Sequence, residues 1–137
     1  MEQLWELVRD PHHLPRWWPR VSRVEDVEES AFTEVMLTRK GKVVRADFQL
    51  EQGEPGRALR WTQRIAGTPF ARVLQSAETD VRLAPLDAAA ASASTEVTIE
   101  LHQTLTGLFP RLGGVMVRRA AAATIDEALD GLERISV

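Results

Sequence analysis

The chain has 137 residues, a length that fits one domain with a core of its own. Its 17 basic and 20 acidic residues nearly balance, unlike the basic footprint of a nucleic-acid-binding protein, so we expect no nucleic-acid partner. The absence of cysteine excludes disulfides and thiolate chemistry. With three histidines, a metal site would need carboxylates for most of its ligands, and we predict no metal and no other cofactor.

Targeting and membrane signals are also missing from the sequence. No apolar run approaches the roughly 20 residues of a membrane span, so we expect no stable membrane insertion. The start, MEQLWELVRD, contains acidic residues and lacks the basic segment of a secretory signal. We therefore expect a cytoplasmic domain over residues 1–137.

The first predicted element is a short amphipathic helix. Its apolar residues recur at helical spacing: Met1, Leu4, Trp5 and Val8. The helix should end near Asp10, because Pro11 disfavours a helical conformation in the residue before it. Asp10 can then cap a new turn with Pro11 at its first position. Since Pro15 and Pro19 divide the next residues into short turns, we predict two short helices before the first strand.

From Val21 onward the apolar residues alternate as in β-strands. Residues 32–50, FTEVMLTRKGKVVRADFQL, predict a hairpin with a two-residue turn at Lys40 and Gly41, which pairs Leu37 with Val44. One face is then apolar: Val35, Leu37, Val44, Ala46, Phe48 and Leu50. The other face carries Glu34, Met36, Thr38, Arg45, Asp47 and Gln49. This division supports the register, since a slip of one residue would reverse the faces.

A second turn, GEPG at residues 53–56, continues the apolar face into the next strand. The predicted pairing places Trp61 opposite Phe48 and Gln63 opposite Ala46. The two predicted turns therefore place the apolar residues of all three strands on the same face of the sheet.

Two more strands are predicted, over residues 72–83 and 95–105. Between them, DAAAASAS at residues 87–94 has the composition of a mobile hairpin tip. In the last strand one face is apolar: Val97, Ile99 and Leu101. The opposite face is polar: Glu96, Thr98, Glu100 and His102.

Helical spacing returns after Gly107 and Pro110. The apolar side of this last helix carries Leu112, Val115, Met116, Ile125, Leu129, Leu132 and Ile135. A sheet with one apolar face must be covered, and only this helix is long enough to do so. We predict an α+β helix-grip fold, in which a curved antiparallel sheet of about six strands wraps around a long C-terminal helix, with two short N-terminal helices.

Two segments resemble a known family. LWELVRDPHHLPRWWPRVSRVE at residues 4–25 resembles the opening of the polyketide cyclase/dehydrase and lipid-transport family of the START-like (SRPBCC) superfamily. TEVTIEL at residues 95–101, followed by a long Ala/Arg-rich helix, resembles its last strand and helix. The resemblance covers essentially the whole chain and implies a single START-like domain over residues 1–137. The family has no universal catalytic motif, and its members enclose a hydrophobic cavity between sheet and helix.

The chain departs from the family pattern at its start, because members usually have a strand before the first helix. Without it, the strands that begin near Val21 and Thr95 would each have an open edge, which proteins normally protect. We expect either that the natural start lies upstream or that a homodimer fills the gap.

The resemblance places the proline-rich turns at one mouth of the cavity, where they hold Trp17 and Trp18. Prolines fix a turn at low entropic cost and can therefore position large rings. One ring should point into the cavity and the other should plug the junction with the sheet. Alternatively, both rings simply cap the core.

The inward face predicts a pocket that is apolar with a few orienting amides. The candidate ligand-binding residues are Trp17, Trp18, Leu37, Arg39, Phe48, Trp61, Gln63, Gln75, Gln103 and Met116. Arg39 falls at a strand end and is expected at the rim. The small residues Gly113, Gly114 and Ala120 to Ala123 of the last helix indicate either close packing on the sheet or room for a ligand.

No catalytic group is predicted, because no inward carboxylate or histidine occurs in the paired strands. His12 and His13 are expected to face solvent, and His102 should form a surface pair with Glu100. Whether the protein is an enzyme stays open at this point.

Three functions compete on this basis. The first is carriage or sequestration of a small hydrophobic ligand, such as a lipid, quinone or polyketide-like aromatic. The second is a polyketide cyclase, aromatase or dehydratase that works largely by orienting a reactive chain, with Arg39 at the rim stabilising an enolate. The third is a protein-interaction module, which predicts a filled core and an apolar surface patch.

Overall fold

The computed structural model describes residues 2–38, 40–86, 94–106 and 111–135, with side chains from residue 117 onward in the last segment. The helices are α1 (Glu2–Arg9), η1 (Pro11–His13), α2 (Leu14–Trp17), η2 (Pro69–Arg72) and α3 (Arg111–Ile135), where η1 and η2 are 3-10 helices. The strands are β1 (Val21–Glu25), β2 (Ala31–Leu37), β3 (Val43–Gln52), β4 (Ala58–Gln63), β5 (Leu74–Pro85) and β6 (Thr95–Leu105).

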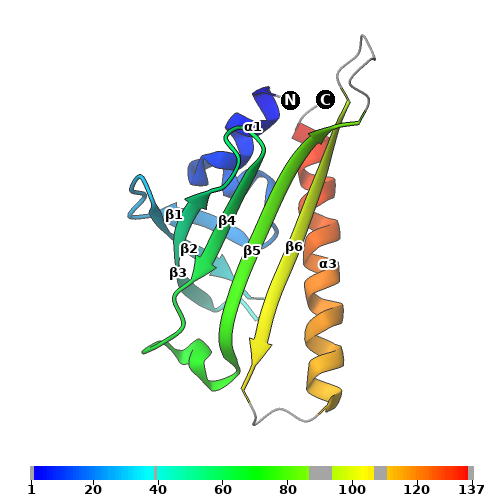
Figure 1. The fold of residues 1–137 in the computed structure, drawn as a ribbon. Helices are drawn as coiled ribbons and strands as arrows, with labels where there is room; N and C mark the ends of the chain where they lie inside the picture. The colour runs from blue at the N-terminus through cyan, green and yellow to red at the C-terminus, as the bar shows by residue number, and fades with distance from the viewer. Residues whose placement is uncertain (1, 39, 87–93, 107–110, 136–137) are drawn as a thin grey trace.

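The six strands form one curved sheet in the order β1-β2-β3-β4-β5-β6, and every neighbouring pair is antiparallel. Figure 1 shows α3 running along the sheet beside β5 and β6, while α1 lies near the last turns of α3 at one end. The predicted α+β helix-grip architecture is confirmed. Among the described residues, no helix has the length and hydropathy of a membrane span.

The N-terminal turns form where the sequence predicts them. The side chain of Asp10 accepts a hydrogen bond from the backbone N–H of His12, and Pro11 occupies the first turn of η1. A second proline, Pro15, lies in the first turn of α2. These turns bring Trp17 to the end of α2, shortly before β1 begins at Val21.

The main core joins α1, α2, the concave face of the sheet and the end of α3. Its buried residues are Trp5, Val8, Leu14, Trp17, Val21, Phe32, Leu59, Trp61, Val81, Leu83, Ile99, Ala128 and Leu132. A second, smaller cluster contains Ile65, Leu74 and Ala77. At Gly131 the helix approaches α2 so closely that a Cβ atom would lie 2.4 Å from the carbonyl oxygen of Trp17.

The first hairpin differs from its predicted register by one residue. Glu34 pairs with Ala46 and Leu37 pairs with Val43. The loop is closed by a hydrogen bond from the backbone N–H of Thr38 to the carbonyl oxygen of Lys42, so it is longer than the predicted two-residue turn. A slip of one residue reverses the faces of a strand. The predicted faces of β2 are therefore wrong: Phe32, Glu34 and Met36 share the face of Ala46 and Phe48.

The second hairpin differs by two residues, which changes partners but preserves faces. Trp61 pairs with Leu50, and Gln63 pairs with Phe48. Because side chains alternate with a period of two, Leu59, Trp61 and Gln63 stay on the predicted inward face. The face prediction for β4 is therefore confirmed although its predicted partners are wrong.

The remaining elements agree closely with the sequence. Residues 95–105 form β6 as predicted, and Ile99 is buried on its inward face. In α3, Leu132 is buried, and Ile125, Leu129 and Ile135 pack against the core. Residues 87–93 of the predicted hairpin tip lie outside what the structure describes, and so do the side chains of Leu112, Val115 and Met116 and the surroundings of Gly113 and Gly114. In the described sheet, β1 and β6 are the edge strands.

Candidate functional site

A cavity of about 260 Å³ lies between the concave face of the sheet and α3. The sheet side is lined by Glu34, Met36, Phe48, Trp61, Gln63, Ala77, Glu78, Thr79, Leu101 and Gln103. Trp18 closes one end, and α3 contributes Val117, Ala120, Ala121 and Thr124. We refer to this space as the sheet–helix cavity.

The cavity exists because α3 presents small side chains where it crosses the middle of the sheet. Residues 117, 120, 121 and 124 follow the i, i+3, i+4, i+7 spacing of one helix face. Two of them are alanines, which leave space opposite the larger side chains of Trp61 and Phe48. The cavity also lies between two packed regions, since Trp61 belongs to the main core and Ala77 to the smaller cluster.

Glu34 is the ionisable group buried in this cavity. Its side chain comes from β2 and only 3% of the residue is exposed. Removal from water disfavours the charged form and raises the pKa of the Glu34 carboxyl to about 8. The carboxyl is therefore largely protonated at neutral pH and can donate a hydrogen bond.

Two other polar groups of the lining lack partners within the described structure. The indole nitrogen of Trp61 (Nε1) and the amide nitrogen of Gln63 (Nε2) are buried without a hydrogen bond. Both groups are donors. Buried donors are normally satisfied in folded proteins, so a pair of them in one cavity lining indicates a place for a ligand or for water.

An aromatic cluster forms the end of the cavity next to α2. The rings of Trp18 and Trp61 meet edge to face with centroids 5.4 Å apart, and Trp18 meets Trp17 in the same way at 5.4 Å. Phe32 also lies edge to face against Trp61. These contacts hold the cavity wall in one geometry, since such pairs stabilise beyond the area that they bury.

A second hollow of about 420 Å³ is lined by residues of β6 and α3. It shares four residues with the sheet–helix cavity: Leu101, Gln103, Val117 and Ala121. These four side chains therefore form the partition between the two spaces.

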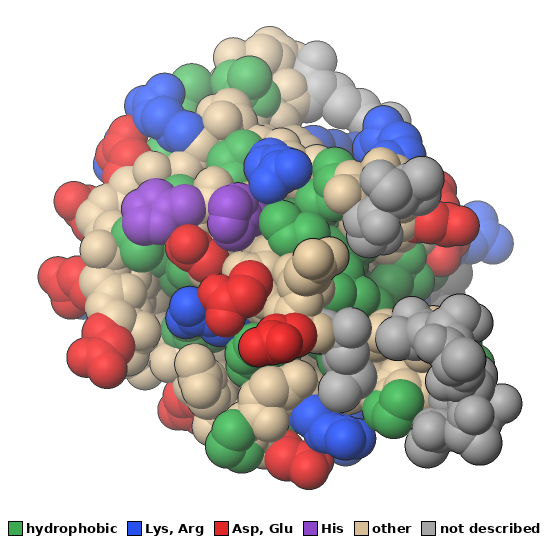
Figure 2. All heavy atoms as spheres, turned by 90° about the horizontal axis from the view of Figure 1, so that it is seen from above, with side chains coloured by type: hydrophobic (Ala, Val, Ile, Leu, Met, Phe, Trp, Pro, Cys, Tyr) green, Lys and Arg blue, Asp and Glu red, His purple; other side chains and the backbone are tan. Residues whose placement is uncertain are grey.

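A larger groove of about 960 Å³ runs over the outside of α2 and the end of α3. Charged residues line it on both sides: Arg16, Arg20, Glu127, Asp130, Glu133 and Arg134. In Figure 2, acidic and basic side chains are interspersed over the end of the molecule that carries α1. This groove is open and carries charged side chains beside Trp17 and Trp18, whereas the cavity buries a carboxyl among apolar side chains. The cavity is therefore the better candidate site.

The structure brings together five of the predicted ligand-binding residues. Trp18, Phe48, Trp61, Gln63 and Gln103 line the sheet–helix cavity. Trp17 is buried in the main core beside them and borders the outer groove instead. Trp18 also packs against the main core and borders the outer groove, so both tryptophans cap the core and Trp18 reaches the cavity as well.

Other predicted site residues lie elsewhere. Leu37 is 45% exposed at the end of β2, and its predicted inward position is wrong because of the register shift. Gln75 is exposed at an irregularity between β5 and β6, which overturns its predicted inward position. Arg39 and the side chain of Met116 lie outside the described residues.

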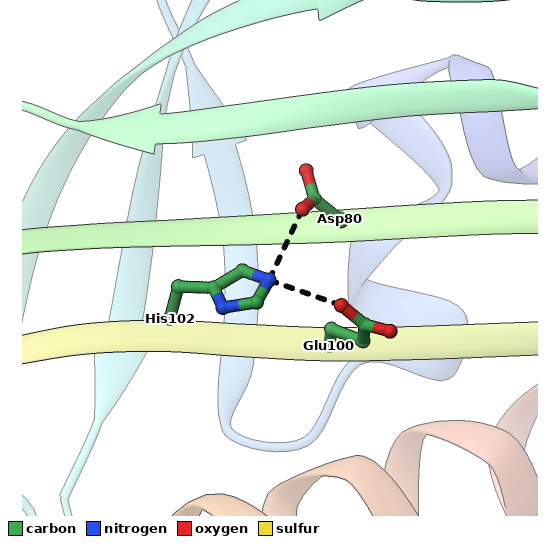
Figure 3. Close-up of side chains that lie close together, drawn as sticks. All are labelled: Asp80, Glu100 and His102. Carbon is green, nitrogen blue, oxygen red and sulfur yellow. Dashed lines mark hydrogen bonds and ion pairs between the residues drawn. The ribbon is translucent and has the colours of Figure 1, made fainter.

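The histidines lie on the surface, as predicted. His12 pairs with Asp10, with 2.9 Å between Nδ1 and a carboxylate oxygen, and two-thirds of its side chain is exposed. Figure 3 shows His102 pointing toward Asp80 of β5 and Glu100 of β6. Its Nε2 lies 3.2 Å from Asp80 and 3.1 Å from Glu100.

These three side chains are close enough together to hold a metal ion. However, Arg60 already donates two hydrogen bonds to the Asp80 carboxylate, at 2.6 and 3.1 Å. The Arg60 guanidinium also holds the pKa of Asp80 below its ordinary value. A cation at this point would compete with a guanidinium that is already in place, so the group is a surface ion-pair network on the convex face.

Glu34 is the residue of the candidate site that the sequence did not predict. The prediction of no inward carboxylate rested on the two-residue turn, and the longer loop overturns it. A signal was present in the sequence, because three-residue hairpin loops place a glycine at their left-handed position, and Gly41 has a φ of +77°. Counting that loop would have placed Glu34 inside.

Comparison with known proteins agrees with this geometry. The model of the family described as polyketide cyclase/dehydrase and lipid transport matches residues 1–136. The fold is similar to that of a START superfamily protein from Mycobacterium smegmatis, with a TM-score of 0.74 and 16% identity over 96% of this chain and 86% of that one. A conserved protein from Geobacillus kaustophilus matches with a TM-score of 0.74 and 15% identity over 97% of this chain and 85% of that one.

A protein from Arthrobacter aurescens, solved in solution, matches with a TM-score of 0.67 and 21% identity over 97% of this chain and 79% of that one. No curated protein sequence matches the chain. The sheet, the gripped helix and the cavity between them define a START-like fold. The chain belongs to the polyketide cyclase/dehydrase and lipid-transport family.

Proposed function

We propose that the protein binds and holds a small apolar molecule in the sheet–helix cavity. The observation that carries this proposal is the cavity itself, which is lined by aromatic and aliphatic side chains and faced by the alanines of α3. Burial of apolar ligand surface favours binding by about 25 cal/mol per Å² before the costs of association. The family's fold is consistent with hydrophobic ligands.

The size of the cavity limits the ligand class. Pockets for drug-sized ligands usually enclose roughly 300–1,000 Å³. The described cavity, at about 260 Å³, lies just below this range. A compact ring system fits this space better than a long lipid chain, so among the ligands considered we favour a small aromatic or quinone-like molecule.

Filling the cavity tests the proposal. Ala121 lines the cavity, whereas Ala122 is exposed on the opposite side of the same helix and does not line it. Ala121→Phe should weaken binding of indane, an apolar bicyclic probe, at least tenfold, and Ala122→Phe should leave it unchanged. Titration by tryptophan fluorescence measures both variants. Equal binding of indane to both variants, or no binding to the parent protein, contradicts the proposal.

A second candidate function, an enzyme of cyclase or dehydratase type, is favoured by one observation. Glu34 places an ionisable group with a pKa of about 8 inside the cavity, where it can exchange a proton with a bound ligand. The test is the product distribution from a poly-β-keto substrate with the parent protein and with Glu34→Gln. A change that requires Glu34 supports catalysis, and identical products with and without protein contradict it.

A further inference from the structure

We infer that the sheet–helix cavity selects an apolar molecule that carries a carbonyl-type oxygen, which accepts hydrogen bonds from Glu34 and from Gln63 or Trp61. The inference rests on the proposed function and adds the polar chemistry of the ligand. It follows from three donors of the lining that have no partner among the described residues, namely the protonated Glu34 carboxyl, the Gln63 amide nitrogen and the Trp61 indole nitrogen.

Glu34 supplies the first donor. Its carboxyl is buried in the lining, and neither a cation nor a hydrogen-bond partner faces it among the described residues. The other titratable residue of the described lining, Glu78, has its carboxylate 3.2 Å from Arg60 on the convex face. Glu34 therefore remains protonated at neutral pH, because burial raises its pKa to about 8.

Gln63 and Trp61 supply the other donors. The Gln63 amide nitrogen and the Trp61 indole nitrogen are both buried without a partner in the described structure. Burying an N–H group without a hydrogen bond destabilises the protein, and an acceptor atom on a ligand would remove this penalty. A ligand oxygen with two lone pairs can accept from two of these groups at once.

A cationic ligand fits these groups less well. An ammonium would ionise Glu34 and bury an ion pair, whose desolvation cost is large in an apolar site. It would also bring further donors to the Gln63 amide nitrogen and the Trp61 indole nitrogen, which need acceptors. The lining therefore favours a neutral ligand with an acceptor oxygen over an amine.

Three probes of one shape separate these possibilities. Indane is a hydrocarbon, 1-indanone adds a carbonyl oxygen, and 1-aminoindane carries a positive charge at neutral pH. The proteins are the parent chain, Glu34→Gln, which keeps a donor of similar shape, and Glu34→Leu, which removes it. Affinities are measured by tryptophan fluorescence and calorimetry at about pH 6 and about pH 9, on either side of the pKa of Glu34.

The expected result is that 1-indanone binds the parent protein about tenfold more tightly than indane at about pH 6. This ratio should fall several-fold at about pH 9, because an ionised carboxylate cannot donate. Glu34→Gln should keep the ratio at both pH values, and Glu34→Leu should reduce it at both. Thermal melts establish that each variant is folded.

Two results overturn the inference while leaving the proposed function intact. In the first, indane and 1-indanone bind with the same affinity at about pH 6. In the second, 1-aminoindane binds most tightly and Glu34→Gln abolishes that binding. If none of the three probes binds the parent protein, the proposed function fails and the inference fails with it.

Discussion

Around Gly131, α3 lies so close to α2 that an added Cβ atom would be 2.4 Å from a backbone oxygen, whereas around Ala121 the same helix leaves a cavity of about 260 Å³. We call residues 125–135 the packed half of α3 and residues 117–124 the cavity half. In the packed half, Ala128 and Leu132 are buried in the main core. In the cavity half, small side chains face Trp61 and Phe48 across open space. The difference shows how one helix can anchor the fold at one end and leave room for a ligand at the other.

Replacing a leucine by alanine should lower the free energy of unfolding more in the packed half of α3 than beside the cavity. Leu132→Ala empties a filled site and should lower the free energy of unfolding by about 2–5 kcal/mol. Leu101 already borders the cavity, so its side chain has fewer packed neighbours to lose. Leu101→Ala should therefore cost only about 1 kcal/mol. Urea denaturation of both variants measures the difference, and equal costs would show that the cavity half is as tightly packed as the other.

The close approach of α3 to α2 at Gly131 predicts that a single added methyl group destabilises the protein. Gly131→Ala places its Cβ against the backbone of Trp17, which cannot move aside as a flexible side chain can. We expect a loss of about 1–3 kcal/mol in the free energy of unfolding. The matched control is Ala121→Gly in the cavity half, where only helix propensity is lost, at about 1 kcal/mol. A neutral or stabilising Gly131→Ala would contradict the close packing.

The buried carboxyl of Glu34 predicts that the free energy of unfolding depends on pH. The pKa of Glu34 is raised from 4.5 to about 8 in the folded protein. Between these values the folded state holds a proton that the unfolded state has released, so stability is full below pH 4.5 and falls as the pH rises toward 8. Between these two pKa values, the free energy of unfolding should fall by about 1.4 kcal/mol per pH unit.

Glu34→Gln should remove this slope and make the protein more stable than the parent at about pH 8. Asp80, whose pKa is lowered by Arg60, acts in a separate window, because its contribution is lost only as the pH falls below its ordinary value of 3.8. Chemical denaturation over this pH range measures the effect. An unchanged slope in Glu34→Gln would show that the carboxyl is solvated rather than buried.

The faces of most strands could be predicted from the sequence because side chains alternate along a strand. In β4 and β6 the inward residues are as predicted, even though the second hairpin is shifted by two residues. A shift of two changes partners without changing faces. Trp61 and Gln63 were therefore identified as inward residues although their predicted partners were wrong.

The single most informative residue of the site could not be predicted by the same reasoning. Glu34 faces inward because the loop before β3 contains more than two residues, and loop length depends on backbone conformation at Gly41 rather than on hydrophobic pattern. The hydrophobic pattern favours the wrong face of β2, because Val35 and Leu37 are more apolar than Glu34. A buried polar residue that departs from the alternation of apolar residues cannot be located from that alternation.

The central claim is that a small apolar molecule binds between the sheet and the cavity half of α3. The four tryptophans report on it directly in a ¹H–¹⁵N spectrum, because each gives one indole N–H signal. On addition of 1-indanone, the signals of Trp61 and Trp18, which line the cavity, should shift most. The signal of Trp5, a residue of α1 that is buried in the main core, should remain in place. No shift at Trp61 and Trp18, or an equal shift of Trp5, would contradict the account.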